Sequence, residues 1–214
     1  MQSSLNIHPT AVVDEGAIIG KGSSVWHFSH VCSNVVIGEN CSLGQSVLVA
    51  DNASLGNNVK VQNNVAIYSG VTIESDVFLG PSCVLTNIIN PRSQISRKTL
   101  YEKTLIKRGA TIGANATILC GTTLGRYCFI GAGAVVTKKV PDYGLVLGNP
   151  GKLSGFMSRH GHKLNFNQKG EAQCPESNYF YKKVGEQVHC LDLNEELPLP
   201  AEFSVGSRPY DSFK

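Results

Sequence analysis

The chain has 214 residues, with 19 lysine and arginine residues against 16 aspartate and glutamate residues, and a formal net charge of +3. So small a charge argues against nucleic acid or an anionic membrane as a partner. Hydrophobic residues make up 42% of the chain, enough for a sizeable core. No apolar run approaches the roughly 18 residues of a membrane span, and the first residues do not resemble a secretory signal. We therefore expect a cytoplasmic protein.

Aliphatic residues recur at every sixth position from Ile7 to Leu85 without a miss, and the pattern resumes from Ile106 to Val136. A small or β-branched residue precedes most of them by two positions. Such residues favour strands, and a fixed short period indicates a repeat architecture. We predict an all-β fold, a parallel β-helix in which three hexads form one 18-residue coil. Coils about 4.8 Å apart would give a prism roughly 30 Å long.

The register breaks once, because Leu85 and Ile106 are not separated by a multiple of six positions. A loop must therefore leave the prism near residues 87–103. It adds nine residues to the repeat if Leu100 and Thr104 begin the next hexad, and otherwise fifteen. Long excursions from a regular scaffold are usually functional.

The hexads stop after Pro141, and we divide the chain into a β-helix over residues 1–152 and a C-terminal part over residues 153–214. A turn at residues 148–152 precedes a candidate short helix near residues 153–160. The rest of this part is expected to be an irregular tail, although its aromatic residues at 179–181 and cysteines at 174 and 190 suit a small hairpin.

The seven cysteines include no C-x-x-C pair, which argues against a zinc ribbon and against thioredoxin-type redox chemistry. Cys41, Cys83 and Cys128 fall at the small inward positions of the repeat, where a thiol serves as core filler. We expect the thiols to be reduced and expect no metal site.

Two sets of motifs carry a family resemblance. Over residues 5–155 the chain resembles the left-handed β-helix acyltransferases of the hexapeptide-repeat superfamily, and residues 130–141 with 146–152 resemble the last coil of members that use acetyl-CoA. Residues 25–30, 60–65 and 85–92 resemble nucleotide-sugar N-acetyltransferases of bacterial surface-polysaccharide (lipopolysaccharide and O-antigen) biosynthesis. Within that group the match is to enzymes that acetylate the 3-amino group of UDP-2-acetamido-3-amino-2,3-dideoxyglucuronate.

The resemblance implies acetyl-CoA as co-substrate and a homotrimer with active sites between neighbouring prisms, the loop reaching over the partner. A three-sided solenoid also has flat faces suited to a closed cyclic contact. Enzymes acting on dTDP-3-amino sugars carry a similar Thr-Asn and Pro-Arg pair, often with aspartate after the asparagine, where this chain has Ile88. A dTDP-amino-sugar N-acyltransferase is therefore the alternative.

Residues 18 positions apart should stack in columns, which places His27 with Asn63 and brings Tyr68 near Asn87. Asn87 is the candidate catalytic residue, because its amide can orient the amine or the thioester carbonyl. The competing interpretation is a loop-starting asparagine bonded to its own backbone. The candidate substrate-binding residues are His27, His30, Asn63, Asn64, Tyr68 and Arg92. The two histidines can instead be surface or packing residues, and the two asparagines a ladder that satisfies turn amides.

The resemblance also suggests a cofactor site in the last coil. Thr137 and Lys138 would meet the adenosine end, and Lys152 the 3′-phosphate, a normal lysine role. Ala132 and Gly133 would offer backbone N–H groups to the pantetheine arm or to the thioester oxygen.

No histidine lies between Val31 and Arg159, and no serine or cysteine stands in a recognisable nucleophile–base pair. We therefore expect direct attack of the amine on the thioester, with catalysis by alignment and with the departing thiolate taking the proton. Two other classes are less favoured. A zinc hydratase needs three converging histidines, which His27 and His30 cannot supply, and a scaffold prism without catalysis would bind neither CoA nor a nucleotide sugar.

Overall fold

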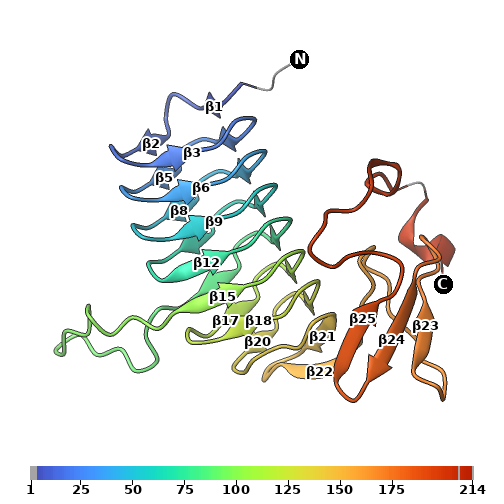
Figure 1. Ribbon diagram of the computed structural model, residues 1–214. Coiled ribbons are helices and arrows are strands. Elements are labelled where there is room, and N and C mark those ends of the chain that lie inside the picture. The colour runs from blue at the N-terminus through green and yellow to red at the C-terminus, as the bar shows by residue number, and fades with distance from the viewer. Residues whose placement is uncertain (1–3, 207, 214) are drawn as a thin grey trace.

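A computed structural model describes residues 4–206 and 208–213, and its main feature is a three-sided prism of stacked coils (Figure 1). Face A contains β1 (Asn6–Ile7), β4 (Ser24–Val25), β7 (Ser42–Leu43), β10 (Lys60–Val61), β13 (Phe78–Leu79), β16 (Thr111–Ile112), β19 (Phe129–Ile130), β21 (Gly144–Leu147) and β22 (Lys152–Phe156). Face B contains β2 (Val12–Val13), β5 (His30–Val31), β8 (Leu48–Val49), β11 (Ala66–Ile67), β14 (Val84–Leu85), β17 (Thr117–Ile118) and β20 (Val135–Val136). Face C contains β3 (Ile18–Ile19), β6 (Val36–Ile37), β9 (Ser54–Leu55), β12 (Val71–Ile73), β15 (Thr104–Ile106) and β18 (Thr123–Leu124). We name the edges by the faces they join: AB, BC and CA.

The hexad pattern is confirmed residue by residue. Each recurring aliphatic position is the last residue of a coil strand, and from Val25 onward all of these side chains are buried. Neighbouring coils pair in parallel with an 18-residue offset, as in Ile67 opposite Val49. Cys41, Cys83 and Cys128 lie in this core, and all seven cysteines are free.

The loop adds fifteen residues to the repeat. Val71 of β12 pairs with Thr104 of β15, an offset of 33 positions in place of 18. The nine-residue alternative is wrong because the Leu100 side chain is exposed and does not enter the core. Residues 86–103 leave the prism at the BC edge and project away from it (Figure 1).

The C-terminal part differs from the expected helix and irregular tail. Residues 152–156 form β22, which pairs antiparallel with β21 and covers the open edge that this strand would otherwise leave exposed. Beyond it, β23 (Glu171–Gln173), β24 (Phe180–Val184) and β25 (Gln187–Cys190) form an antiparallel sheet, and the 3-10 turns η1 (Ala201–Phe203) and η2 (Tyr210–Phe213) follow. The helix prediction at 153–160 is wrong, whereas the hairpin at the aromatic segment is confirmed. Among the described residues, no helix has the length and apolar character needed to span a membrane.

This C-terminal sheet packs on the CA edge of the prism. Tyr127 and Tyr143 from that edge stack with ring centroids 5.2 Å apart, and Tyr143 meets Tyr181 of β24 at 5.6 Å. The Tyr127 hydroxyl donates to the Glu195 backbone carbonyl at 2.6 Å. The chain's own C-terminal part thus occupies the last turns of the CA edge.

We predict that Gly113→Ala destabilises the prism by about 1–3 kcal/mol, because a Cβ there would lie 2.5 Å from the backbone nitrogen of Ala132 in the next coil. Urea unfolding monitored by circular dichroism measures the change. Gly206→Ala is the control, since its nearest neighbour, the Glu176 carboxylate, is 3.9 Å away. Equal midpoints for the two variants would contradict this account of coil packing.

Candidate active site

The structure places the predicted site residues along the two edges that flank face B. The turns of the AB edge carry His27, Asn63, Asn64, Ala132 and Gly133. The BC edge carries Tyr68, Asn87, Thr137, Lys138 and the loop residue Arg92, and His30 lies on face B between the two edges. Lys152 begins β22, directly after a turn in which Gly151 donates to Val135 of face B at 2.8 Å. The CA edge receives none of them.

Both candidate histidines have partners within the first coils. The His27 ring stacks on His8 with centroids 3.6 Å apart. His30 Nε2 lies 3.1 Å from both carboxylate oxygens of Asp14. These contacts therefore orient both rings, and each ring keeps part of its surface open, His27 at the AB edge and His30 on face B toward the BC edge.

Asn63 forms the asparagine ladder that was the alternative for it. Its Oδ1 accepts the backbone N–H of Gln45 at 2.9 Å, which leaves the Nδ2 donor facing outward. Asn64 holds the left-handed turn conformation at φ 61° and donates its backbone N–H to the Gln45 carbonyl. The side-chain oxygen of Asn63 and the backbone of Asn64 therefore stabilise the turns of this edge.

Asn87 stands where the chain leaves the prism for the loop. Its backbone carbonyl accepts the N–H of Glu102 at 3.0 Å, which closes the base of the loop. The half-buried carboxamide makes no hydrogen bond with any other described residue, so the local backbone bond of the alternative interpretation is not formed. Tyr68 is 37% exposed in the preceding coil of the same edge. Donor and acceptor groups of Asn87 are therefore available to a ligand.

The last coil corrects one expectation about the cofactor. The Gly133 N–H donates to the Ala114 carbonyl at 2.9 Å and so cannot serve a bound thioester. Ala132 makes no such backbone bond among the described residues, and its N–H is the available donor at this turn. Thr137, Lys138 and Lys152 are exposed, with free side-chain heads.

A group of possible metal ligands lies at the BC edge of the first coils. Ligand atoms of Asp14, His30 and Cys32 fall within 4.8 Å of one another, with Cys32 Sγ 3.9 Å from His30 Nε2. Burial, followed by the charges of Asp14 and Asp51, raises the pKa of the Cys32 thiol. Near neutral pH the free thiol is therefore protonated.

A hollow of about 340 Å³ opens beside the AB edge, next to His27. Trp26, Gln45 and Gln62 line it together with His27 and Asn63. Gln45 shares the predicted column of His27 and Asn63, 18 residues from each. Trp26 and Gln62 were not among the predicted site residues, although they adjoin His27 and Asn63 in the sequence.

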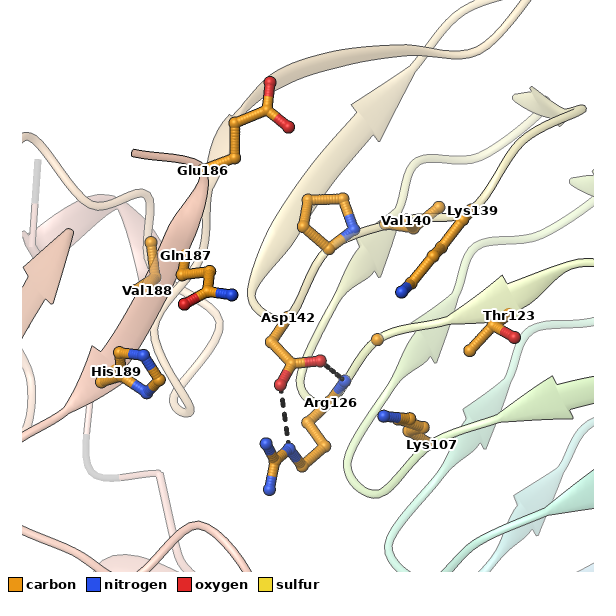
Figure 2. Close-up of a pocket in the computed structure, with 12 residues that line it drawn as sticks. Lys107, Thr123, Arg126, Lys139, Val140, Asp142, Glu186, Gln187, Val188 and His189 are labelled. Atoms are coloured by element: carbon orange, nitrogen blue, oxygen red, sulfur yellow. Dashed lines mark hydrogen bonds and ion pairs between the residues drawn. The ribbon is translucent and has the colours of Figure 1, made fainter. Parts of the chain in front are cut away.

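A second cavity, of about 480 Å³, lies between the CA edge and the C-terminal sheet (Figure 2). Lys107, Arg126, Lys139 and Asp142 line it from the prism, and residues 186–189 from the sheet. Asp142 accepts from the Arg126 backbone N–H and Nε at 2.8 and 2.9 Å, as the dashed lines show. No predicted site residue reaches it, because it is created by tertiary packing that the repeat pattern does not specify.

Cys174 is the one thiol with a lowered pKa. Burial raises this pKa, but the neighbouring His160, Ser158 and Ser177 outweigh burial and bring it to about 6. The side chain has no exposed surface and lies in the C-terminal sheet, remote from face B. We therefore assign it no role in the reaction.

The chain matches the family described as bacterial transferase hexapeptide (six repeats) over residues 16–51, 52–87 and 103–138. It is 44% identical over 169 residues to the dTDP-3-amino-3,6-dideoxy-alpha-D-galactopyranose 3-N-acetyltransferase of Aneurinibacillus thermoaerophilus, covering 78% of this chain and 87% of that protein. The chain belongs to this hexapeptide transferase family and is a left-handed β-helix acyltransferase by fold, as the sequence motifs predicted.

More distant similarities extend over shorter segments or weaker alignments. A tetrahydropyridine-2,6-dicarboxylate N-acetyltransferase of Staphylococcus aureus is 36% identical over 78 residues, which is 36% of this chain and 30% of that protein. A GDP-perosamine N-acetyl transferase variant from Caulobacter crescentus, solved with CoA and GDP-perosamine, superposes with a TM-score of 0.48 at 22% identity. That alignment covers 72% of this chain and 58% of the solved one, so the chain spans somewhat more than half of that protein.

We predict that iodoacetamide modifies Cys32 in the folded protein, while the six buried thiols react only after denaturation. Because the Cys32 pKa is raised, less thiolate is present at a given pH, and alkylation should be slower than for a free thiol below pH 9. Asp14→Asn removes a negative charge, lowers this pKa and should speed the reaction. Mass spectrometry of timed samples measures both rates, and an unchanged rate in the variant would refute the electrostatic assignment.

Proposed function

We propose that this protein transfers the acetyl group of acetyl-CoA to the 3-amino group of a nucleotide-linked amino sugar. The observation that carries the proposal is the arrangement of the predicted acceptor and cofactor residues along the two edges of a single face. Acceptor residues occupy the earlier coils and cofactor residues the last one. The 44% identical relative, named for a 3-N-acetyltransferase reaction on a dTDP-linked sugar, supports the same chemistry. We propose that the acetylated nucleotide sugar is used in bacterial surface-polysaccharide biosynthesis.

The relative's substrate favours a dTDP-linked 3-amino sugar over a UDP-linked one. The resemblance of residues 85–92 to enzymes that act on a UDP-linked amino-sugar uronate supports the second candidate. The two acceptors share the 3-amino group that the reaction modifies. They differ in the nucleotide base, and only the UDP-linked uronate has a sugar carboxylate. Residues other than those at the reacting amine must recognise these two groups.

We further propose that the protein acts as a homotrimer with face B turned toward the threefold axis. The outward side chains of face B are mostly apolar: Val12, Leu48, Ala66, Val84 and Val135, with His30 and Thr117. Val12 and Val84 are 54% and 47% exposed in the single chain. Face A carries mostly polar residues at the equivalent positions, and the C-terminal sheet occupies the last turns of the CA edge. Burying face B removes this exposed apolar surface from water.

Threefold packing through face B has a direct consequence for the site. In a triangular prism the AB and BC edges flank this face, so the AB edge of one chain meets the BC edge of the next. The groove between chains would then contain Ala132 and His27 from one chain and Asn87 and Tyr68 from its neighbour. This arrangement unites residues that a single chain holds on separate edges.

The reaction needs alignment more than side-chain acid–base chemistry. The neutral amine attacks the thioester carbonyl, the carbon–sulfur bond breaks, and the amine proton passes to the departing thiolate. Asn87 orients the amine through its free carboxamide, and the Ala132 N–H stabilises the oxyanion. Proximity of two bound substrates supplies several kcal/mol of the barrier reduction.

We predict sugar-dependent release of thiol when the protein is mixed with acetyl-CoA and a dTDP-3-amino-3,6-dideoxyhexose, followed with a disulfide dye. The UDP-linked uronate should react with a lower kcat/KM. A higher kcat/KM for the UDP sugar would reverse the order of the two candidates. Absence of release with both, together with no acetyl-CoA binding by calorimetry, would contradict the transferase assignment.

We predict that Asn87→Ala lowers kcat by about 10²-fold, the usual cost of removing one preorganised hydrogen-bonding group from a transition state. The KM for acetyl-CoA should stay unchanged, since cofactor residues lie in the last coil. Asn165→Ala, on the exposed surface of the C-terminal part, is the matched control and should keep wild-type kinetics. A wild-type kcat for Asn87→Ala would remove this residue from the reaction.

A complementation experiment tests the composite site. Asn87→Ala impairs the BC edge and Ala132→Arg blocks the AB edge, so each variant alone should have about 1% of wild-type activity or less. Random mixed trimers formed by co-expression place an intact AB edge beside an intact BC edge in about a quarter of all sites. We therefore expect about a quarter of wild-type activity, and none from co-expressing Ala132→Arg with a second AB-edge variant. No recovery in mixed trimers would place the whole site within one chain.

A further inference from the structure

We propose that the aromatic cluster at the AB edge, centred on Trp26, is the platform on which the pyrimidine base of the acceptor nucleotide stacks. This inference rests on the proposed function and assigns the part of the acceptor that lies farthest from the reacting amine. The platform consists of Trp26 and His27, backed by His8 of the preceding coil.

Trp26 and His27 present nearly parallel rings to solvent. Their planes lie 9° apart, and His8 stacks behind His27 at 3.6 Å and fixes its orientation. Trp26 is 41% exposed although it is the only tryptophan of a chain with few aromatic residues. A pair of nearly parallel rings left open to solvent suits a flat, partly apolar ligand, because every base offers a π-face for stacking.

The hollow beside the platform supplies hydrogen-bonding groups at its rim. Asn63 directs its Nδ2 donor outward, because its oxygen is held by the Gln45 backbone N–H. Gln45 and Gln62 also line the hollow, and the carboxamide of neither forms a hydrogen bond with another described residue. Amide groups offer both donors and acceptors, which matches the alternating carbonyl and N–H groups on the edge of uracil or thymine.

The place of the platform along the prism fits an extended nucleotide sugar. Trp26 precedes the coil of Asn87 by three coils, roughly 15 Å at the usual strand spacing. The predicted cofactor residues lie beyond Asn87 in the opposite direction, in the last coil. Base, diphosphate, amino sugar and thioester would therefore follow one another along one groove.

The single tryptophan makes the platform directly observable. We expect TMP and UMP, added without acetyl-CoA, to quench the intrinsic tryptophan fluorescence saturably, since the base covers Trp26. In turnover, Trp26→Leu should raise the KM for the nucleotide sugar about tenfold, with kcat and the KM for acetyl-CoA unchanged. Trp26→Phe should restore most of the affinity, because it keeps a stacking ring. Phe180→Leu, an exposed aromatic on the C-terminal sheet, is the control and should change nothing.

The outcomes separate this inference from the proposed function. Unquenched fluorescence and an unchanged KM in Trp26→Leu, with acetyl transfer intact, would overturn the platform and leave the function standing. Quenching by adenosine 3′,5′-bisphosphate but not by TMP or UMP would assign the cluster to the cofactor and overturn it as well. Quenching by TMP or UMP in a protein that acetylates no sugar would support the platform and reject the proposed function.

Discussion

The structure depends on one constraint: each turn of six residues must bury one aliphatic side chain in the prism. Ile67, Leu79 and Ile112 illustrate it, each ending a two-residue strand and each shielded from solvent. Because coils pair with an 18-residue offset, every outward position is repeated one strand spacing further along the axis. Chemistry placed at one turn is therefore aligned with chemistry placed 18 residues later. Buried side chains fill the interior of the described prism, so substrates must bind on its outer surface, along its edges.

The three edges have separate tasks. The last turns of the CA edge are covered by the C-terminal sheet through Tyr127 and Tyr143, and the other two edges border face B. Turn residues at those two edges keep free polar groups, such as the carboxamide of Asn87 and the N–H of Ala132. In the proposed trimer these groups meet across the contact between chains. Association and catalysis would then depend on the same face.

The prism and the stacking of its edges could be predicted from the sequence, because both follow from the hexad period. Three features could not. Residues 152–156 form a strand because they pair with the open edge of β21. The local sequence of residues 152–156 does not indicate this pairing. The Gly133 N–H is already bonded to Ala114 of the preceding coil, a contact visible only in three dimensions. The hollow that Trp26 lines is formed by side chains of three successive coils, and its presence is seen only in the structure.

The central claim is that face B is buried between copies of this chain and that the site is completed there. Light scattering of the purified protein on a sizing column measures it most directly, with Leu48→Arg on face B as the comparison. We predict a particle of three times 23.0 kDa for the wild-type chain, and a smaller, inactive particle for Leu48→Arg that keeps the β-rich circular dichroism spectrum. A wild-type particle of 23.0 kDa that is active as a single chain would contradict the account.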